Sequence, residues 1–143
     1  TSGQSRVGSL VCFKEGRPSK DDYRHYGLDP RSGADDYAGI MEVVKRRLER
    51  AKREGRGPDL LVIDGGKGQL NSALEAIINE KNKYKGRPPF LVSIAKGRDQ
   101  EGDRLYLQGR VEPLYPDRSH PGFLFLQRVR DEAHRFGLST HRR

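Results

Sequence analysis

A short, wholly apolar run that ends in a carboxylate and two glycines most constrains how this chain can fold. Residues 60–63 read Leu-Leu-Val-Ile, a pattern typical of a strand buried on both faces. Asp64, Gly65 and Gly66 follow, and apolar residues then recur at helical spacing over 70–78. This order predicts an α/β unit, in which ligands bind beyond the carboxyl ends of the strands. Asp64 is therefore a candidate site residue.

Hydrophobic periodicity predicts two strands and a helix in the first part of the chain. Residues 7–13 alternate as a strand does, and 20–26 are expected to return as a second, more polar strand. A helix is expected to open at Asp35 and Asp36, since acids favour a helix N-terminus, and to end at Gly55.

The second half of the chain predicts another strand, a small hairpin and a last helix. Residues 90–95 form a second apolar run, expected to pair in parallel with 60–63 because a helix connects the two. Residues 105–107 and 110–112 are expected to form a small polar hairpin, and 123–138 the last helix.

Composition points to one soluble domain with a polyanionic partner. The 143 residues carry a formal net charge of +8, and only 33% of them are hydrophobic. A chain this basic most simply binds nucleic acid. Charge alone is equally compatible with a domain that is basic for another reason. Cys12 is the single cysteine, so a disulfide framework is excluded, and no apolar run is long enough for a membrane span. We expect a cytoplasmic protein.

The glycines after Asp64 do not form a nucleotide-binding loop. A Walker loop requires four residues between its first glycine and Gly-Lys, and then Ser or Thr. Here Gly66-Lys67-Gly68 is followed by Gln69. Lys67 at a helix start is unfavourable for the helix dipole, which indicates an anionic group nearby.

Two groups of charged residues remain open to two interpretations. His134 lies four residues after Arg130 on the last helix, within a surface rich in ion pairs, and imidazole can bind a metal or transfer a proton. Lys45, Arg46 and Arg47 form either a solvated helix face or a contact to phosphate.

Taken together, these stretches resemble the C-terminal nuclease domain of the UvrC family of excinucleases over nearly the whole chain. The motifs that carry the resemblance are residues 8–13, 22–26, 35–38, 41–43, 58–71, 91–97, 130–136 and 141–142. One such motif could arise by chance, but their order along the chain is very specific.

The resemblance implies an α/β fold of the ribonuclease H type, a mixed β-sheet flanked by helices. It further implies a site that uses Mg²⁺ or Mn²⁺ to make the 5′ incision in damaged double-stranded DNA during nucleotide excision repair. Asp64 matches an aspartate of that site and a metal ligand, His134 matches its histidine, and Asp36 matches a further acid that could equally be only a helix cap. Lys67 and Arg130 are candidates for holding phosphate. The implied partners are UvrB and, indirectly, UvrA, through regions outside residues 1–143.

One departure from the family pattern bears on activity. The family's first catalytic aspartate lies in an Asp-Ile-Ser-His motif directly before the segment that matches Thr1-Ser2-Gly3. We therefore expect residues 1–143 to be a fragment truncated at both ends, without the first, central strand, and inactive alone. The alternatives are a non-catalytic basic domain that binds nucleic acid and an α/β domain that binds a nucleotide at the glycine turn.

Overall fold

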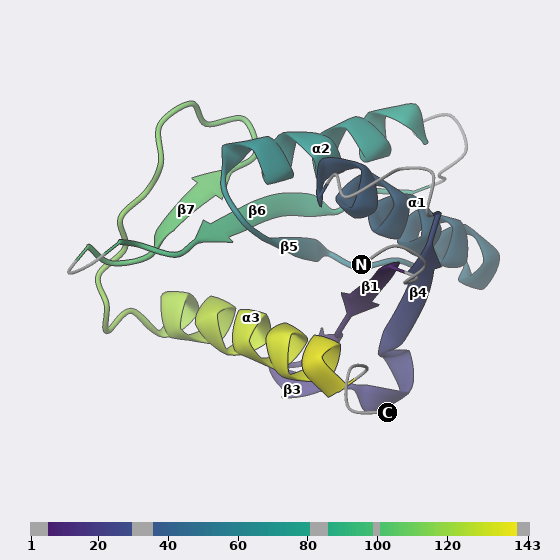
Figure 1. Cartoon of the computed structure of the whole chain (residues 1–143), viewed down its shortest axis with the longest axis horizontal. Helices are drawn as coiled ribbons and strands as arrows, with labels where there is room; N and C mark the ends of the chain where they lie inside the picture. The colour runs from purple at the N-terminus through teal and green to yellow at the C-terminus, as the bar shows by residue number, and fades with distance from the viewer. Residues whose placement is uncertain (1–5, 30–35, 81–85, 99–100, 140–143) are drawn as a thin grey trace.

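A three-stranded sheet lies at the centre of the computed structural model (Figure 1). The structure describes residues 6–29, 36–80, 86–98 and 101–139. The strands β5 (Leu60–Asp64), β6 (Phe90–Ala95) and β7 (Arg104–Leu107) are ordered β5-β6-β7. β5 and β6 pair in parallel, as their apolar runs and connecting helix predicted, and β7 pairs antiparallel to β6.

Helices cover both faces of this sheet. α1 (Asp36–Glu54) and α2 (Lys67–Asn79) pack on one face, and α3 (Pro121–Ser139) packs on the other (Figure 1). Successive side chains of a strand point to opposite faces, so Leu91 joins the α1–α2 core while Val92 joins the α3 core. The predicted α/β class, a mixed sheet flanked by helices, is confirmed. None of the helices in the described residues has the length and apolar character to cross a membrane.

A separate antiparallel pair of strands precedes α1. β1 (Arg6–Leu10) pairs with β4 (Arg24–Leu28), and between them lie a small hairpin of β2 (Phe13–Lys14) and β3 (Arg17–Pro18) and a 3₁₀ turn at Lys20–Asp22. The predicted return strand over 20–26 therefore begins later, because the 3₁₀ turn takes up its first residues. Asp35, expected to open α1, lies outside the described residues.

β1 and β4 are held by helices rather than by the three-stranded sheet. Within the described residues no hydrogen-bonded strand joins β1 to β5. β1 instead lies against α1 and α3. Its approach to α1 is close, since a Cβ atom on Gly8 would lie 2.3 Å from Val43 Cγ2.

The predicted hairpin of 105–107 with 110–112 is wrong. β7 pairs with β6 instead, and Leu105 forms an isolated bridge with Leu114. The physical reason is burial: Leu105 is 7% exposed and packs in the α3 core, which requires its strand to join the central sheet. Local alternation showed a strand at 105–107 but could not show which neighbour it pairs with.

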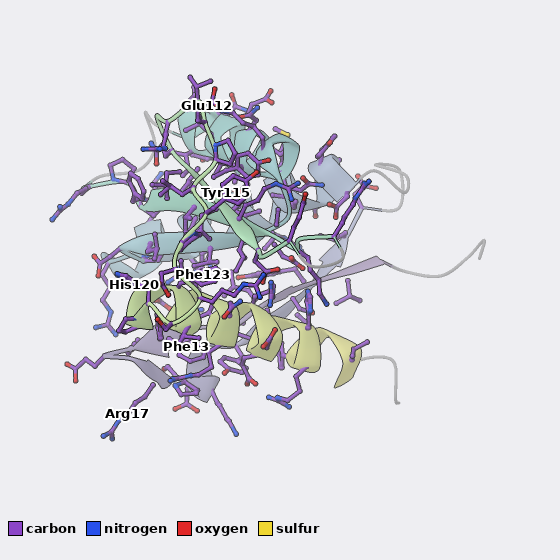
Figure 2. The ribbon with its side chains drawn as sticks, turned by 90° about the vertical axis from the view of Figure 1, so that its left-hand side faces the viewer. Phe13, Arg17, Glu112, Tyr115, His120 and Phe123 are labelled. Atoms are coloured by element: carbon purple, nitrogen blue, oxygen red, sulfur yellow. The ribbon has the colours of Figure 1, made fainter. Side chains whose placement is uncertain are left out.

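α3 lies between the sheet and the β2–β3 hairpin. Figure 2 shows Phe123, near the start of α3, on the side of the sheet and Phe13 on the opposite side of the helix. Phe123 is 4% exposed within the α3 core. The Phe13 ring meets the Phe125 ring edge-on, with centroids 5.6 Å apart. These contacts on two sides fix the position of α3 relative to β5.

Candidate active site

The turn from β5 into α2 presents Asp64 at the carboxyl end of its strand. Gly65 has φ of +140°, which favours glycine, and its N–H donates to the Ile94 carbonyl at 3.0 Å. The Gly66 N–H donates to Gln69 Oε1 at 3.0 Å. Both glycine N–H groups thus donate to acceptors of the protein itself, whereas a phosphate loop directs such groups to a ligand. This agrees with the absence of a phosphate-loop pattern in the sequence.

Asp64 meets His134 of α3. Asp64 Oδ2 and His134 Nε2 form a hydrogen bond between residues 70 apart in the sequence. The two side chains remain 52% and 55% exposed, so solvent and a large substrate reach them. The structure therefore brings the two residues expected to be catalytic together on an open surface.

A partly buried ion pair holds α3 in place one turn before His134. Arg130 Nη1 donates to Asp103 Oδ2 at 2.8 Å, with side chains 10% and 13% exposed. Gln127 Nε2 donates to the same oxygen at 3.1 Å, and the Gly97 N–H donates to Asp103 Oδ1 at 3.1 Å. Partial burial raises the pKa of Asp103, but the bonds from these groups outweigh it and leave the pKa below its ordinary value. Asp103 is therefore an ionised anchor between α3 and the loop after β6.

Asp36 lies near the glycine turn but is not joined to Asp64. Its Oδ2 accepts a long hydrogen bond of 3.4 Å from Gln69 Nε2. The neighbouring Tyr37 packs on the first turn of α2, where a Cβ atom on Gly68 would lie 2.6 Å from the Tyr37 hydroxyl. Gln69 thus links the start of α1 to the turn that carries Asp64.

The two cations expected to hold phosphate near Asp64, Lys67 and Arg130, are both engaged in polar contacts with other protein groups. Lys67 Nζ donates to the carbonyls of Arg110 and Val111 at 3.2 and 3.0 Å. Arg130 is bound to Asp103 as described above and also to Asp131 at 3.3 Å. Their roles as phosphate ligands stay predictions, and each would need to exchange a protein contact for a phosphate.

The three cations of α1 differ in exposure. Arg46 donates to the Gly27 carbonyl at 2.7 Å and lies over the Tyr26 ring, 5.4 Å from its centroid. Arg47 is buried at 9% exposure, whereas Lys45 is exposed. A phosphate contact by this helix face stays a prediction. Of the three cations, the exposed Lys45 is best placed to make it.

Asp64 is the residue expected to bind a metal ion, and His134 lies beside it. No group of three carboxylate, imidazole or thiol side chains within the described ranges is arranged to hold a metal ion. A carboxylate oxygen is nevertheless a donor that Mg²⁺ and Mn²⁺ accept, and Mg²⁺ commonly takes one or two protein carboxylates and keeps several waters. The Asp64 carboxylate therefore fits a divalent ion that has further ligands from elsewhere.

The sequence reasoning missed the two residues that organise the site. Gln69 could have been found, because a glutamine three positions after a helix N-cap is a known capping pattern. Asp103 lies in a polar loop without periodicity, and only the fold shows that its carboxylate meets α3.

Comparison with known proteins assigns the chain to a family. The family described as the UvrC RNAse H endonuclease domain matches residues 1–138. The chain belongs to this family. UvrABC system protein C of Desulfotalea psychrophila is 42% identical over 147 residues, covering 99% of this chain and 23% of the relative. The same-named protein of Methanosarcina acetivorans is 46% identical over 142 residues, covering 99% of this chain and 26% of the relative.

The match to the UvrC family covers the chain but only part of its relatives. UvrABC system protein C of Cytophaga hutchinsonii is 42% identical over 141 residues, covering 98% of this chain and 22% of the relative. The chain thus spans about a quarter of the length of the relatives it matches, at 22–26%. Membership of the UvrC family agrees with the α/β fold and confirms the resemblance found in the sequence.

Proposed function

We propose that this chain is the nuclease domain of a UvrC-type protein, and that the intact protein uses it to make the 5′ incision in damaged double-stranded DNA during nucleotide excision repair. The meeting of Asp64 and His134 on an exposed surface is the observation that carries this proposal. Family membership and the formal charge of +8 support it, since a polyanionic substrate requires cations on the protein.

Asp64 and His134 have separate roles in this proposal. Asp64 would hold the divalent ion, Mg²⁺ or Mn²⁺, and orient the imidazole through their shared hydrogen bond. His134 would position the attacking water and accept its proton, which imidazole does near neutral pH. The metal, when bound, supplies Lewis-acid activation of water and neutralises charge on the scissile phosphate.

Asp36 is a secondary candidate for the same site. It approaches the glycine turn only through Gln69, and as the first residue of α1 it also stabilises the helix dipole. We therefore place it as a residue that supports the Asp64 turn.

The partners that we propose follow from the relatives. The names of the relatives place them in a UvrABC system, so we propose UvrB, and UvrA indirectly, as the proteins that deliver DNA to this domain in the cytoplasm. Their contact surface is expected in parts of the relatives that this chain does not match.

The decisive experiment replaces Asp64 in the full-length protein. Asp64→Asn should abolish the 5′ incision of a lesion-bearing duplex, because the amide is a poor metal ligand, and it should leave DNA binding intact. Asp59→Asn is the matched control, since Asp59 is exposed beside the opposite end of β5. Full incision by the Asp64 variant would contradict the proposal and favour a basic domain that only binds nucleic acid.

We also propose that residues 1–143 alone nick DNA weakly or not at all. No group of three carboxylate, imidazole or thiol side chains among the described residues could hold a metal ion, and a nuclease that activates water with a bound metal needs such a group. A nicking assay with Mn²⁺ should therefore show activity in the full-length protein and little in the isolated chain. Equal activity in the two proteins would contradict this expectation.

A further inference from the structure

We infer that Lys96 binds the phosphate backbone of the DNA strand beside Asp64, an inference that rests on the proposed function. Lys96 directly follows β6, the parallel neighbour of the strand that ends in Asp64. The inference depends on three properties of Lys96: its place relative to Asp64, the rigidity of its backbone, and a charge that the described residues leave unpaired.

The pairing register places Lys96 next to the site. Asp64 is in register with Ile94, and Lys96 lies two residues farther along the same chain. With a rise of about 3.3 Å per residue and strands about 4.8 Å apart, an extended chain puts the Cα atoms of Lys96 and Asp64 about 8 Å apart. The four-carbon side chain of lysine covers much of that separation.

Side-chain alternation puts Lys96 on the face that carries His134. Ile94 packs in the α3 core with Phe123, so it points toward α3. Residues two apart in an extended chain share a face, so Lys96 follows Ile94 on that side. His134 reaches Asp64 from this same face.

The backbone of Lys96 is held on both sides. Ala95 pairs with Arg104 in β7, and the Gly97 N–H donates to Asp103, which is bound to Arg130 of α3. A Cβ atom on Gly97 would lie 2.2 Å from the Glu101 carbonyl oxygen, so the chain is tightly packed there. The same carboxylate thus fixes the chain beside Lys96 and the helix that carries His134.

Lys96 carries an exposed positive charge in this surface. It is exposed and makes no hydrogen bond or ion pair with any described residue. Neighbouring cations are engaged, since Lys67 contacts two carbonyls, Arg130 contacts Asp103, and Arg104 contacts the Tyr106 hydroxyl at 2.9 Å. An ammonium group beside a metal-binding carboxylate is suited to a phosphate oxygen, because the phosphate carries the opposite charge.

The test measures incision and DNA binding in the full-length protein. Lys96→Gln should lower the incision rate about 100-fold, as loss of one charge-stabilising donor does in other enzymes. With EDTA present to prevent cleavage, the slope of log K against log salt for a duplex should fall in magnitude by about 0.9, the contribution of one phosphate contact. Lys96→Arg should keep the slope and restore most of the rate.

Arg87→Gln is the matched control. It removes one positive charge from an exposed position just before β6, at the opposite end of the same strand. The inference holds if Lys96→Gln changes both rate and slope while Arg87→Gln changes neither. It is overturned if Lys96→Gln behaves as the wild type, or if both variants reduce the slope equally.

Failure of the proposed function is distinguishable from failure of this inference. If Asp64→Asn still incises, the proposed function is wrong, and the salt slope alone then decides whether Lys96 contacts phosphate. If Asp64→Asn is inactive and Lys96→Gln is fully active with an unchanged slope, only the inference fails.

Discussion

Asp64 is partnered by a histidine and by solvent. A carboxylate at the end of an apolar strand costs several kcal/mol to bury unpaired, on the order of the penalties seen for charged groups in proteins. The side chain avoids this cost by remaining 52% exposed and by bonding to His134. The pattern of residues 60–64 therefore predicted that Asp64 lies where a partner and solvent reach it.

Gly97 shows how a single residue without a side chain shapes the site. Gly97→Ala should lower the free energy of unfolding by about 1–3 kcal/mol, the usual cost of overpacking. Its Cβ would lie 2.2 Å from the Glu101 carbonyl oxygen and 2.4 Å from that of Gly102, so backbone atoms have to move. Urea unfolding followed by circular dichroism measures this difference.

Gly27→Ala is the control for that substitution. A Cβ at Gly27 has no atom within 4 Å, and Gly27 lies in β4 without a positive φ. We expect its stability to stay within about 0.5 kcal/mol of the wild type, as for an ordinary surface change. Equal losses in the two variants would contradict the packing argument.

At the scale of elements, β4 and the segment before it hold the end of α3 through two contacts, Tyr23 with Glu132 and His25 with Phe136, which together form a clamp on the helix. The Tyr23 hydroxyl donates to Glu132 Oε2 at 2.8 Å, and the His25 ring stacks on Phe136 with centroids 3.9 Å apart. Burial and the bond to Glu132 raise the pKa of Tyr23 to about 12, so its phenol remains a donor at neutral pH. These contacts lie on both sides of His134 in the sequence and set the rotation of its helix.

Glu132 makes this clamp sensitive to acid. Bonds from Arg135 and then from Tyr23 hold the pKa of Glu132 at about 2, below its ordinary 4.5. A carboxyl group with a lower pKa in the folded state stabilises the fold above its ordinary pKa and loses that contribution as the pH falls toward the lower value. We expect unfolding free energy to decrease between about pH 5 and pH 2, and to decrease less in Glu132→Gln.

Thermal unfolding across that pH range measures the contribution of Glu132. Glu75→Gln is the control, because Glu75 is exposed on α2 and makes no ion pair or hydrogen bond with its side chain among the described residues. Its pH dependence should follow the wild type. An unchanged slope in Glu132→Gln would show that the clamp does not depend on the ionised carboxylate.

At the scale of the whole molecule, the three-stranded sheet and the β1–β4 pair share the helices α1 and α3. β6 lies in the middle of the larger sheet, with Leu91 and Ile94 at 0% exposure. β1 and β4 form only a two-stranded pair, which depends on side-chain contacts to α1 and α3. Two strands without further pairing are marginally stable alone.

Native-state hydrogen exchange should therefore divide the molecule into two parts. Amides of β6 are expected to exchange only by global unfolding, whereas amides of β1 and β4 should exchange earlier by local opening. Mass spectrometry of fragments after timed exchange distinguishes the two sets. Equal protection of β1 and β6 would contradict this separation.

Local pattern alone determined most of the elements. The apolar run at 60–63, the stripes of the three helices and the parallel pairing of β5 with β6 follow from burial periodicity and from right-handed connections. These rules act over neighbouring residues, and so a sequence expresses them directly. The candidate acid Asp64 came from the same local pattern.

Tertiary structure decided which charged groups have partners and which strands meet. The sequence alone could not show that Arg130 is paired with Asp103, that Arg47 is buried, or that β7 joins β6. Nor did the residue pattern of α3 separate His134 from a surface of ion pairs, although the family resemblance did. The physical reason is distance along the chain: the Asp64–His134 contact joins residues 70 apart, and only the packing of α3 on the sheet brings them together.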